Sequence, residues 1–82
     1  MKLEIVTPEQ LVFSGEVSLL TVPGTSGRFT ILKNHAPIIS SLTKGIITYR
    51  VKDVDSHLTI EDGFVEVSKN VISIAVEGVT YE

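Results

Sequence analysis

Apolar and polar residues alternate along most of this chain, and a period of two is typical of β-strands. Near the start, Leu3 and Ile5 fall on one side of such a strand, whereas Lys2 and Glu4 fall on the other. No segment repeats apolar residues at i, i+3, i+4 and i+7 behind a capping residue, and β-branched residues are frequent throughout. The pattern therefore predicts strands and disfavours helix.

Turn residues divide the alternating pattern into eight or more short strands. The predicted strands are 2–5, 11–22, 28–32, 38–42, 46–51, 57–60, 64–68 and 71–76. Ser14-Gly15 predicts a bulge or bend within the second strand, Asp62-Gly63 predicts a two-residue hairpin turn, and Lys69-Asn70 predicts another turn. Two sheets packed face to face accommodate this many large apolar residues better than one sheet with a wet face. We predict one domain over residues 1–82, an all-β, two-sheet β-sandwich of about ten short, mostly antiparallel strands.

Composition and charge exclude several classes of protein. The chain has 82 residues and a formal charge of −3, and its five Lys and two Arg are scattered, so nucleic-acid binding is not expected. The absence of Cys excludes disulfides and thiolate metal sites. Met1-Lys2-Leu3-Glu4 does not start a signal peptide, and no apolar run approaches the roughly 20 residues that span a bilayer. We expect no direct membrane insertion, so membrane association would occur through another protein.

Two histidines are the only candidates for general-base chemistry near neutral pH. His35 and His57 lie outside any recognisable catalytic motif, and a metal site formed with Asp55 or Glu61 would lack diagnostic spacing. Both read more simply as turn or surface histidines.

Serine and glycine motifs give little further support for an enzyme. Ser40-Ser41 lacks the glycine pattern of a nucleophile elbow, and Ser26 is flanked by turn residues. Residues 23–28 carry glycines but lack the Gly-Lys-Ser/Thr ending of a phosphate-binding loop. We therefore predict no catalytic, cofactor-binding or metal-binding residues, and a domain that acts by presenting surfaces.

Four segments together resemble the N-terminal domain of the ATP synthase epsilon subunit. They are residues 3–9 followed by Phe13-Ser14-Gly15, residues 23–32 running into His35-Ala36-Pro37, Leu42 and Gly45 at the expected spacing, and residues 63–67 with Asn70-Val71. Three positions depart from the family's usual pattern. Thr30 and Asn34 stand where glycine is usual, and Arg28 stands where an acid is common; only Arg28 bears on function, because Asn tolerates left-handed backbone and Thr suits a strand.

The resemblance implies a mechanical role in the central stalk of an F-type ATP synthase. A non-catalytic rotor subunit of this kind binds the gamma subunit and the polar loops of the c-ring, and it helps couple proton translocation to ATP synthesis. By resemblance, Ser26, Gly27, Arg28 and the nearby His35 would contact the c-ring. Ala36, Pro37 and Ile38 would contact the gamma subunit. The expected location is peripheral, on the cytoplasmic face of the inner (plasma) membrane, within the F1 sector.

In longer family members a helical hairpin with any ATP site follows the sandwich, where this sequence has only residues 76–82. The resemblance thus implies a short form without that hairpin, and with no cofactor and no bound nucleotide. The alternatives are an unrelated β-sandwich that binds a ligand or a protein, and a small hydrolase. A ligand module would have only five aromatic residues for stacking and no Trp.

Overall fold

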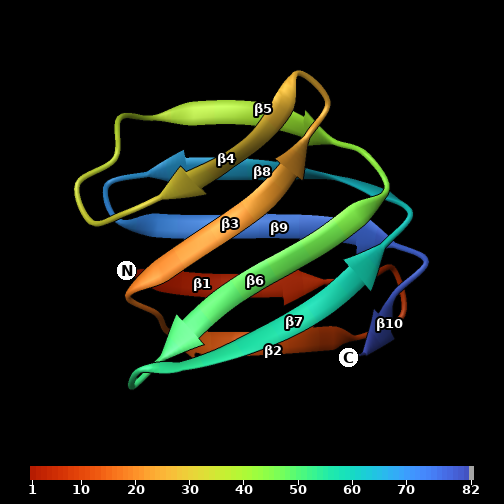
Figure 1. Ribbon diagram of the computed structural model, residues 1–82, viewed down its shortest axis with the longest axis horizontal. Coiled ribbons are helices and arrows are strands. Elements are labelled where there is room, and N and C mark those ends of the chain that lie inside the picture. Colours follow the sequence, from red (N-terminus) through yellow and green to blue (C-terminus); the bar gives the residue numbers. More distant parts are fainter. Residues whose placement is uncertain (82) are drawn as a thin grey trace.

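The computed structural model describes residues 1–81, which form ten strands (Figure 1). Strand bounds follow the predicted alternation closely in the middle of the chain, where 38–42 is reproduced residue for residue. The strands are β1 (Lys2–Val6), β2 (Leu11–Glu16), β3 (Leu19–Gly24), β4 (Gly27–Ile31), β5 (Ile38–Leu42), β6 (Gly45–Val51), β7 (Val54–Ile60), β8 (Asp62–Ser68), β9 (Val71–Glu77) and β10 (Thr80–Tyr81).

The ten strands form one hydrogen-bonded sheet that folds over itself into two layers. The first layer has the order β10-β7-β6-β3 with β4 on β3, and the second has the order β5-β8-β9-β1-β2. The only bridge between β3 and β5 is the pair Gly24 and Leu42, which joins the layers. All pairs are antiparallel except β1 with β9. In Figure 1 the strands of the first layer run diagonally across those of the second, so the predicted all-β sandwich of about ten mostly antiparallel strands is confirmed.

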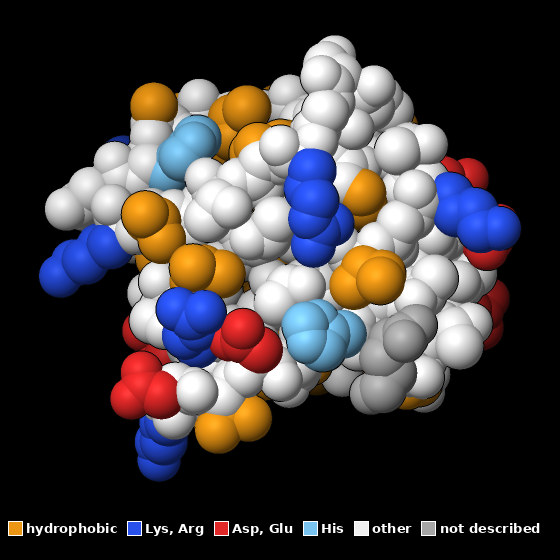
Figure 2. All heavy atoms as spheres, viewed as in Figure 1, with side chains coloured by type: hydrophobic (Ala, Val, Ile, Leu, Met, Phe, Trp, Pro, Cys, Tyr) orange, Lys and Arg blue, Asp and Glu red, His pale blue; other side chains and the backbone are white. Residues whose placement is uncertain are grey.

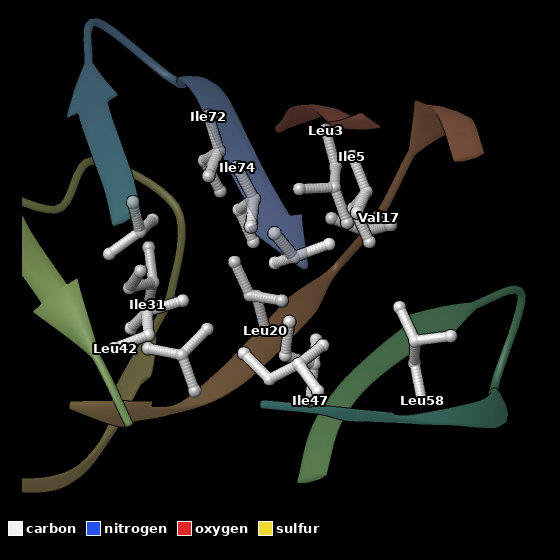
Figure 3. Packing of buried hydrophobic residues seen from close by; sticks show 14 of the residues in the cluster. Leu3, Ile5, Val17, Leu20, Ile31, Leu42, Ile47, Leu58, Ile72 and Ile74 are labelled. Carbon is white, nitrogen blue, oxygen red and sulfur yellow. The ribbon is translucent and has the colours of Figure 1, made fainter. Parts of the chain in front are cut away.

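The core lies between the layers and is made of the inward side of each alternating strand. In β8 and β9, every second residue is buried and its neighbours are exposed. Figure 3 shows Leu3, Ile5, Ile72 and Ile74 of the second layer facing Leu20, Ile47 and Leu58 of the first. Each fully buried aliphatic side chain contributes about 1.5–3 kcal/mol relative to exposure, and no polar side chain is buried among residues 1–81.

Two tight hairpins use left-handed residues other than glycine. Lys52 (φ 50°) and Asp53 (φ 65°) connect β6 to β7, and Lys69 (φ 52°) and Asn70 (φ 62°) connect β8 to β9. Positive φ at both central residues is the signature of the type I′ turn, whose twist matches that of the strands. The predicted turn at Lys69-Asn70 is confirmed.

The predicted hairpin at Asp62-Gly63 is wrong, because both residues lie inside β8. The chain passes there from β7 in the first layer to β8 in the second, and the two strands do not pair. Gly63 is buried opposite Val76, and an added Cβ would lie 2.4 Å from the Ala75 carbonyl oxygen. This glycine is therefore required by close approach of the neighbouring backbone and not by a turn.

The predicted bulge at Ser14-Gly15 is also wrong. These residues pair regularly with Glu4 and Leu3, and the irregularity lies instead at the Val6 end of the β1–β2 pair. The predicted single strand 11–22 is two strands in different layers, separated at Val17-Ser18.

The last described segment continues as a strand. Gly78 has φ 69°, and β10 then pairs Thr80 and Tyr81 with Thr59 and Leu58 of β7. Glu82, the last residue of the predicted domain, lies outside the described residues. Residues 1–81 contain no helix, and hence no helix that is long and apolar enough to cross a bilayer.

Candidate functional site

The predicted c-ring residues Ser26 and Gly27 lie at the tip of the β3–β4 hairpin. Gly24 pairs with Gly27, and Thr25 and Ser26 form the exposed turn between them. Gly27 has φ 132°, a conformation that favours glycine, and nothing lies within 4 Å of where its Cβ would be. The Thr25 hydroxyl hydrogen-bonds the Ser41 hydroxyl at 2.8 Å, which ties the tip to β5.

Arg28 does not project from this tip but lies across the outer face of the first layer. Its guanidinium donates to the Ile46 carbonyl oxygen and, at 3.4 Å, to the Thr48 hydroxyl oxygen, both on β6. The Thr48 hydroxyl also hydrogen-bonds Nδ1 of His57 at 3.0 Å. Figure 2 views this face and shows basic, acidic and histidine side chains interspersed with small hydrophobic patches.

The structure does not bring His35 to the hairpin tip. At about 3.3 Å per residue, β4 extends roughly 15 Å away from the tip, and His35 lies beyond its far end. Its backbone N–H donates to the Leu32 carbonyl at 3.1 Å, and its Nδ1 lies 2.7 Å from the Ala36 carbonyl oxygen. His35 belongs instead with the loop that precedes β5.

The predicted gamma-contact residues divide between surface and core. Ala36 and Pro37 are exposed, whereas Ile38 is half-buried and packs against the core. Ile39 points the other way and is 75% exposed. The large exposed apolar side chain of this segment is therefore Ile39, which directly follows the three predicted contact residues.

An exposed apolar face, which the sequence reasoning missed, covers the outside of the second layer. We define the apolar face as Val6, Pro8, Ile39, Phe64 and Ala75. Ile39 and Phe64, on neighbouring strands β5 and β8, are 75% and 62% exposed. Two hollows adjoin them, of about 300 Å³ and 260 Å³, and share Val6, Phe64 and Ala75 in their linings.

Carboxylates surround this apolar face. Glu4 and Glu66 line the first hollow, and Asp62 and Glu77 line the second. The sequence did contain a signal for the face: Phe64 has the same strand parity as Glu66, and the opposite parity to Val65 and Val67. A large aromatic residue that shares its side of a strand with a charge is expected to face solvent.

The outer face of the first layer carries an ion pair. Nε of Arg50 donates to Oδ1 of Asp55 at 2.7 Å, and Nη2 donates to Oδ2 at 3.3 Å. This hydrogen bonding, with the charge attraction between the groups, lowers the pKa of Asp55 and raises the pKa of Arg50 from their ordinary values. Both groups remain in solvent, so the pair is a surface feature.

The described residues offer little for catalysis. His35 pairs with a backbone carbonyl and His57 with a threonine hydroxyl, so within residues 1–81 neither ring is paired with a serine. No group of three or more His, Asp or Glu residues in that range is placed to hold a metal ion. The distinctive feature of the molecule is its apolar face.

Sequence comparison relates nearly the whole chain to one family. Residues 1–81 match the family described as ATP synthase, Delta/Epsilon chain, beta-sandwich domain. An ATP synthase epsilon chain of Leptospira interrogans is 42% identical over 77 residues, which cover 94% of this chain and 61% of that relative. An ATP synthase epsilon chain of Chlorobium limicola is 42% identical over 80 residues, which cover 96% of this chain and 91% of the relative.

Solved structures share the fold. A chain in the cryo-EM structure of Euglena gracilis mitochondrial ATP synthase superposes with a TM-score of 0.90 at 20% identity, over 96% of this chain and 51% of that one. A chain in the central stalk/c-ring structure of Tetrahymena thermophila mitochondrial ATP synthase gives a TM-score of 0.84 at 20% identity, over 98% and 65%. At this identity, the likeness concerns the architecture.

Proposed function

Since the chain belongs to the ATP synthase delta/epsilon chain β-sandwich family, we propose that it is a non-catalytic subunit of the central stalk of an F-type ATP synthase. In this role it binds the gamma subunit and the c-ring, and it turns with the rotor while proton flow is coupled to ATP synthesis. It lies peripherally at the cytoplasmic face of the inner (plasma) membrane, in the F1 sector.

The observation that carries the proposal is the apolar face. Ile39 and Phe64 expose most of their side chains side by side, and Val6, Pro8 and Ala75 extend the surface between the two hollows. Large apolar and aromatic residues gathered in one place are typical of a site that another protein covers. A subunit whose task is to be held in a rotor needs such a permanent interface.

We assign this face to the gamma subunit. The exposed Ala36 and Pro37 lead directly into β5, and Pro37, Ile39 and Glu66 line one further surface hollow, so the predicted gamma contact and the apolar face are continuous. The contact then includes Ile39 in place of Ile38. The carboxylates of Glu4, Glu66, Asp62 and Glu77 favour a partner surface whose apolar centre is flanked by Lys or Arg.

We assign the c-ring contact to the β3–β4 hairpin tip with Ser26 and Gly27, together with Arg28, which lies next to the tip on the outer face of the first layer. The tip is exposed and polar, and its glycine allows close approach of another backbone. His35 lies past the end of β4 that is opposite the tip, so we leave it out of the c-ring contact. We assign it to the surroundings of the gamma contact, next to Ala36.

Binding to the gamma subunit of the same organism tests the proposal. The wild-type chain should form a stable complex on co-expression, and Phe64→Glu should weaken it at least about 30-fold, as expected for a central aromatic hot spot. Val54→Glu is the matched control, because Val54 is 65% exposed but lies on the other layer. Its binding should be unchanged. Absence of a wild-type complex would refute the rotor role, and full binding by Phe64→Glu would move the interface elsewhere.

A ligand-binding module is the second candidate, because the larger hollow of the apolar face, about 300 Å³, reaches the lower end of the size range of small-molecule sites. A ligand-binding module would form no complex with the gamma subunit, so the same co-expression experiment distinguishes it from a rotor subunit.

A further inference from the structure

Asn34 and Asn70 join the loop before β5 to the β8–β9 hairpin through a reciprocal pair of hydrogen bonds. The Asn34 backbone N–H donates to Oδ1 of Asn70 at 2.7 Å, and Nδ2 of Asn70 donates to Oδ1 of Asn34 at 3.1 Å. The two residues are 36 positions apart in the chain. Both residues have positive φ, 67° and 62°.

Backbone conformation alone does not require asparagine at position 70. Lys69, its neighbour in the same turn, has φ 52°, and Lys52 and Asp53 form the equivalent turn between β6 and β7. Several residue types thus adopt this conformation in the chain. What Asn70 adds is an amide side chain that bonds in both directions.

Asn70 also contacts a third segment. Its backbone carbonyl oxygen accepts a hydrogen bond from the backbone N–H of Lys2, at the start of β1, at 2.9 Å. Since β1, β8 and β9 are hydrogen-bonded neighbours in the second layer, Asn70 is itself anchored to the rigid sheet. It therefore provides a fixed point to which the loop can be attached.

Besides the Asn34–Asn70 pair, the loop has two hydrogen bonds of its own, from the His35 N–H to the Leu32 carbonyl oxygen and between His35 Nδ1 and the Ala36 carbonyl oxygen, and neither ties it to the sheet of the second layer. Lys33, Asn34, Ala36 and Pro37 are all exposed, and only His35 among residues 33–37 is partly buried. Without burial, a segment is ordered mainly by its hydrogen bonds and by its attached ends. The Asn34–Asn70 pair acts near the start of this stretch, two residues before Ala36, the first residue assigned to the partner.

We propose that Asn70 is a positioning residue that fixes the 33–37 loop so that Ala36 and Pro37 meet the gamma subunit in a preformed shape. The inference rests on the proposed gamma contact. Its physical basis is preorganisation: a loop that is already ordered loses less conformational entropy when it binds. Asn70 would therefore raise affinity without touching the partner.

Three glycine variants separate this role from a general need for stability. Asn70→Gly keeps the left-handed turn at no steric cost but removes both side-chain bonds. Asn34→Gly removes only the Asn34 Oδ1 acceptor and keeps the backbone N–H that donates to Asn70. Lys69→Gly, in the same turn and at the same sign of φ, is the control that leaves the pair intact.

Two readouts on the full chain decide the matter: amide exchange at Asn34 and His35, and affinity for the gamma subunit of the same organism. Asn70→Gly should speed exchange at these amides about tenfold and weaken binding to the gamma subunit about tenfold. Asn34→Gly should change both quantities by a smaller factor. Lys69→Gly should change neither exchange nor affinity. Unchanged exchange in Asn70→Gly would overturn the inference, as would faster exchange with full affinity. If the wild-type chain binds no gamma subunit, the rotor role fails, whereas the loop-fixing role still stands or falls on exchange.

Discussion

Gly63 provides a direct test of the packing between β8 and β9. In Gly63→Ala, the new Cβ would lie 2.4 Å from the Ala75 carbonyl oxygen, 2.9 Å from a Val76 side-chain carbon and 3.1 Å from the Val76 Cα. A Cβ keeps at least 3.0 Å from such atoms, so the backbone of β9 must move by at least about 0.6 Å. The obstacle is main chain in the middle of a sheet and cannot rotate away as a side chain would.

The size of the effect follows from the kind of clash. Overpacking a well-filled interior costs about 1–3 kcal/mol, and a main-chain obstacle favours the upper part of that range. A domain of this length has a total stability of roughly 4–12 kcal/mol. We expect Gly63→Ala to lose about 2–3 kcal/mol of unfolding free energy and about 10–20 °C of Tm.

Urea unfolding and thermal melts followed by circular dichroism measure both quantities. Ser68→Ala, an exposed change on the same strand, is the control and should stay within about 0.5 kcal/mol of wild type. Gly63→Asn distinguishes a steric requirement for glycine from a requirement for turn conformation. If position 63 were in a turn, asparagine would destabilise the chain less than alanine, because asparagine tolerates positive φ. The reasoning is refuted if Gly63→Ala is as stable as wild type, or if Gly63→Asn is less harmful than Gly63→Ala.

Two predictions concern charged groups on the first layer. The pKa of Asp55 is lower in the folded chain than its unfolded value of about 3.9, so its stabilising contribution is complete above that value and is lost as pH falls through the folded pKa. Melts from pH 2 to 6 should therefore show a weaker acid dependence for Asp55→Asn, and an equal dependence would contradict the pairing. Arg28→Glu should lower proton-driven ATP synthesis several-fold in reconstituted vesicles while the domain stays folded, with Arg28→Gln in between; unchanged synthesis would remove Arg28 from the c-ring contact.

Much of the fold could be predicted from the sequence because alternation is a local property of each strand. The strand at 38–42 and the turn at Lys69-Asn70 needed no knowledge of distant residues. Asp62-Gly63 gave a wrong hairpin prediction, because this dipeptide is common in hairpin turns. Here Gly63 lies where β9 closely approaches β8, and that approach involves Ala75, twelve residues away. The break at Val17-Ser18 was missed for a similar reason, since it marks a change of layer.

The candidate site was predictable in part. The loop that leads into β5 was found by resemblance, yet the position of its side chains depends on the pleat: Ile38 points to the core and Ile39 to solvent. The local clue was weak: Ile38 shares its side of the strand with Leu42, whereas Ile39 shares its side with Ser41. Phe64 carried a clearer clue in its parity with Glu66, although phenylalanine is among the residues most often buried.

The parallel pairing of β1 with β9 determines when the domain can form during synthesis. Lys2 pairs with Val71, so about 70 residues must follow β1 before its partner exists. At roughly 5–20 residues per second, the ribosome takes about 4 to 14 s over that distance. During this interval the β1–β2 hairpin can form alone, but one edge of β1 stays unpaired and the inward side of Leu3 and Ile5 stays uncovered. Completion of this sandwich therefore waits until β9 has been synthesised, and until then the N-terminal hairpin exposes an unpaired strand edge.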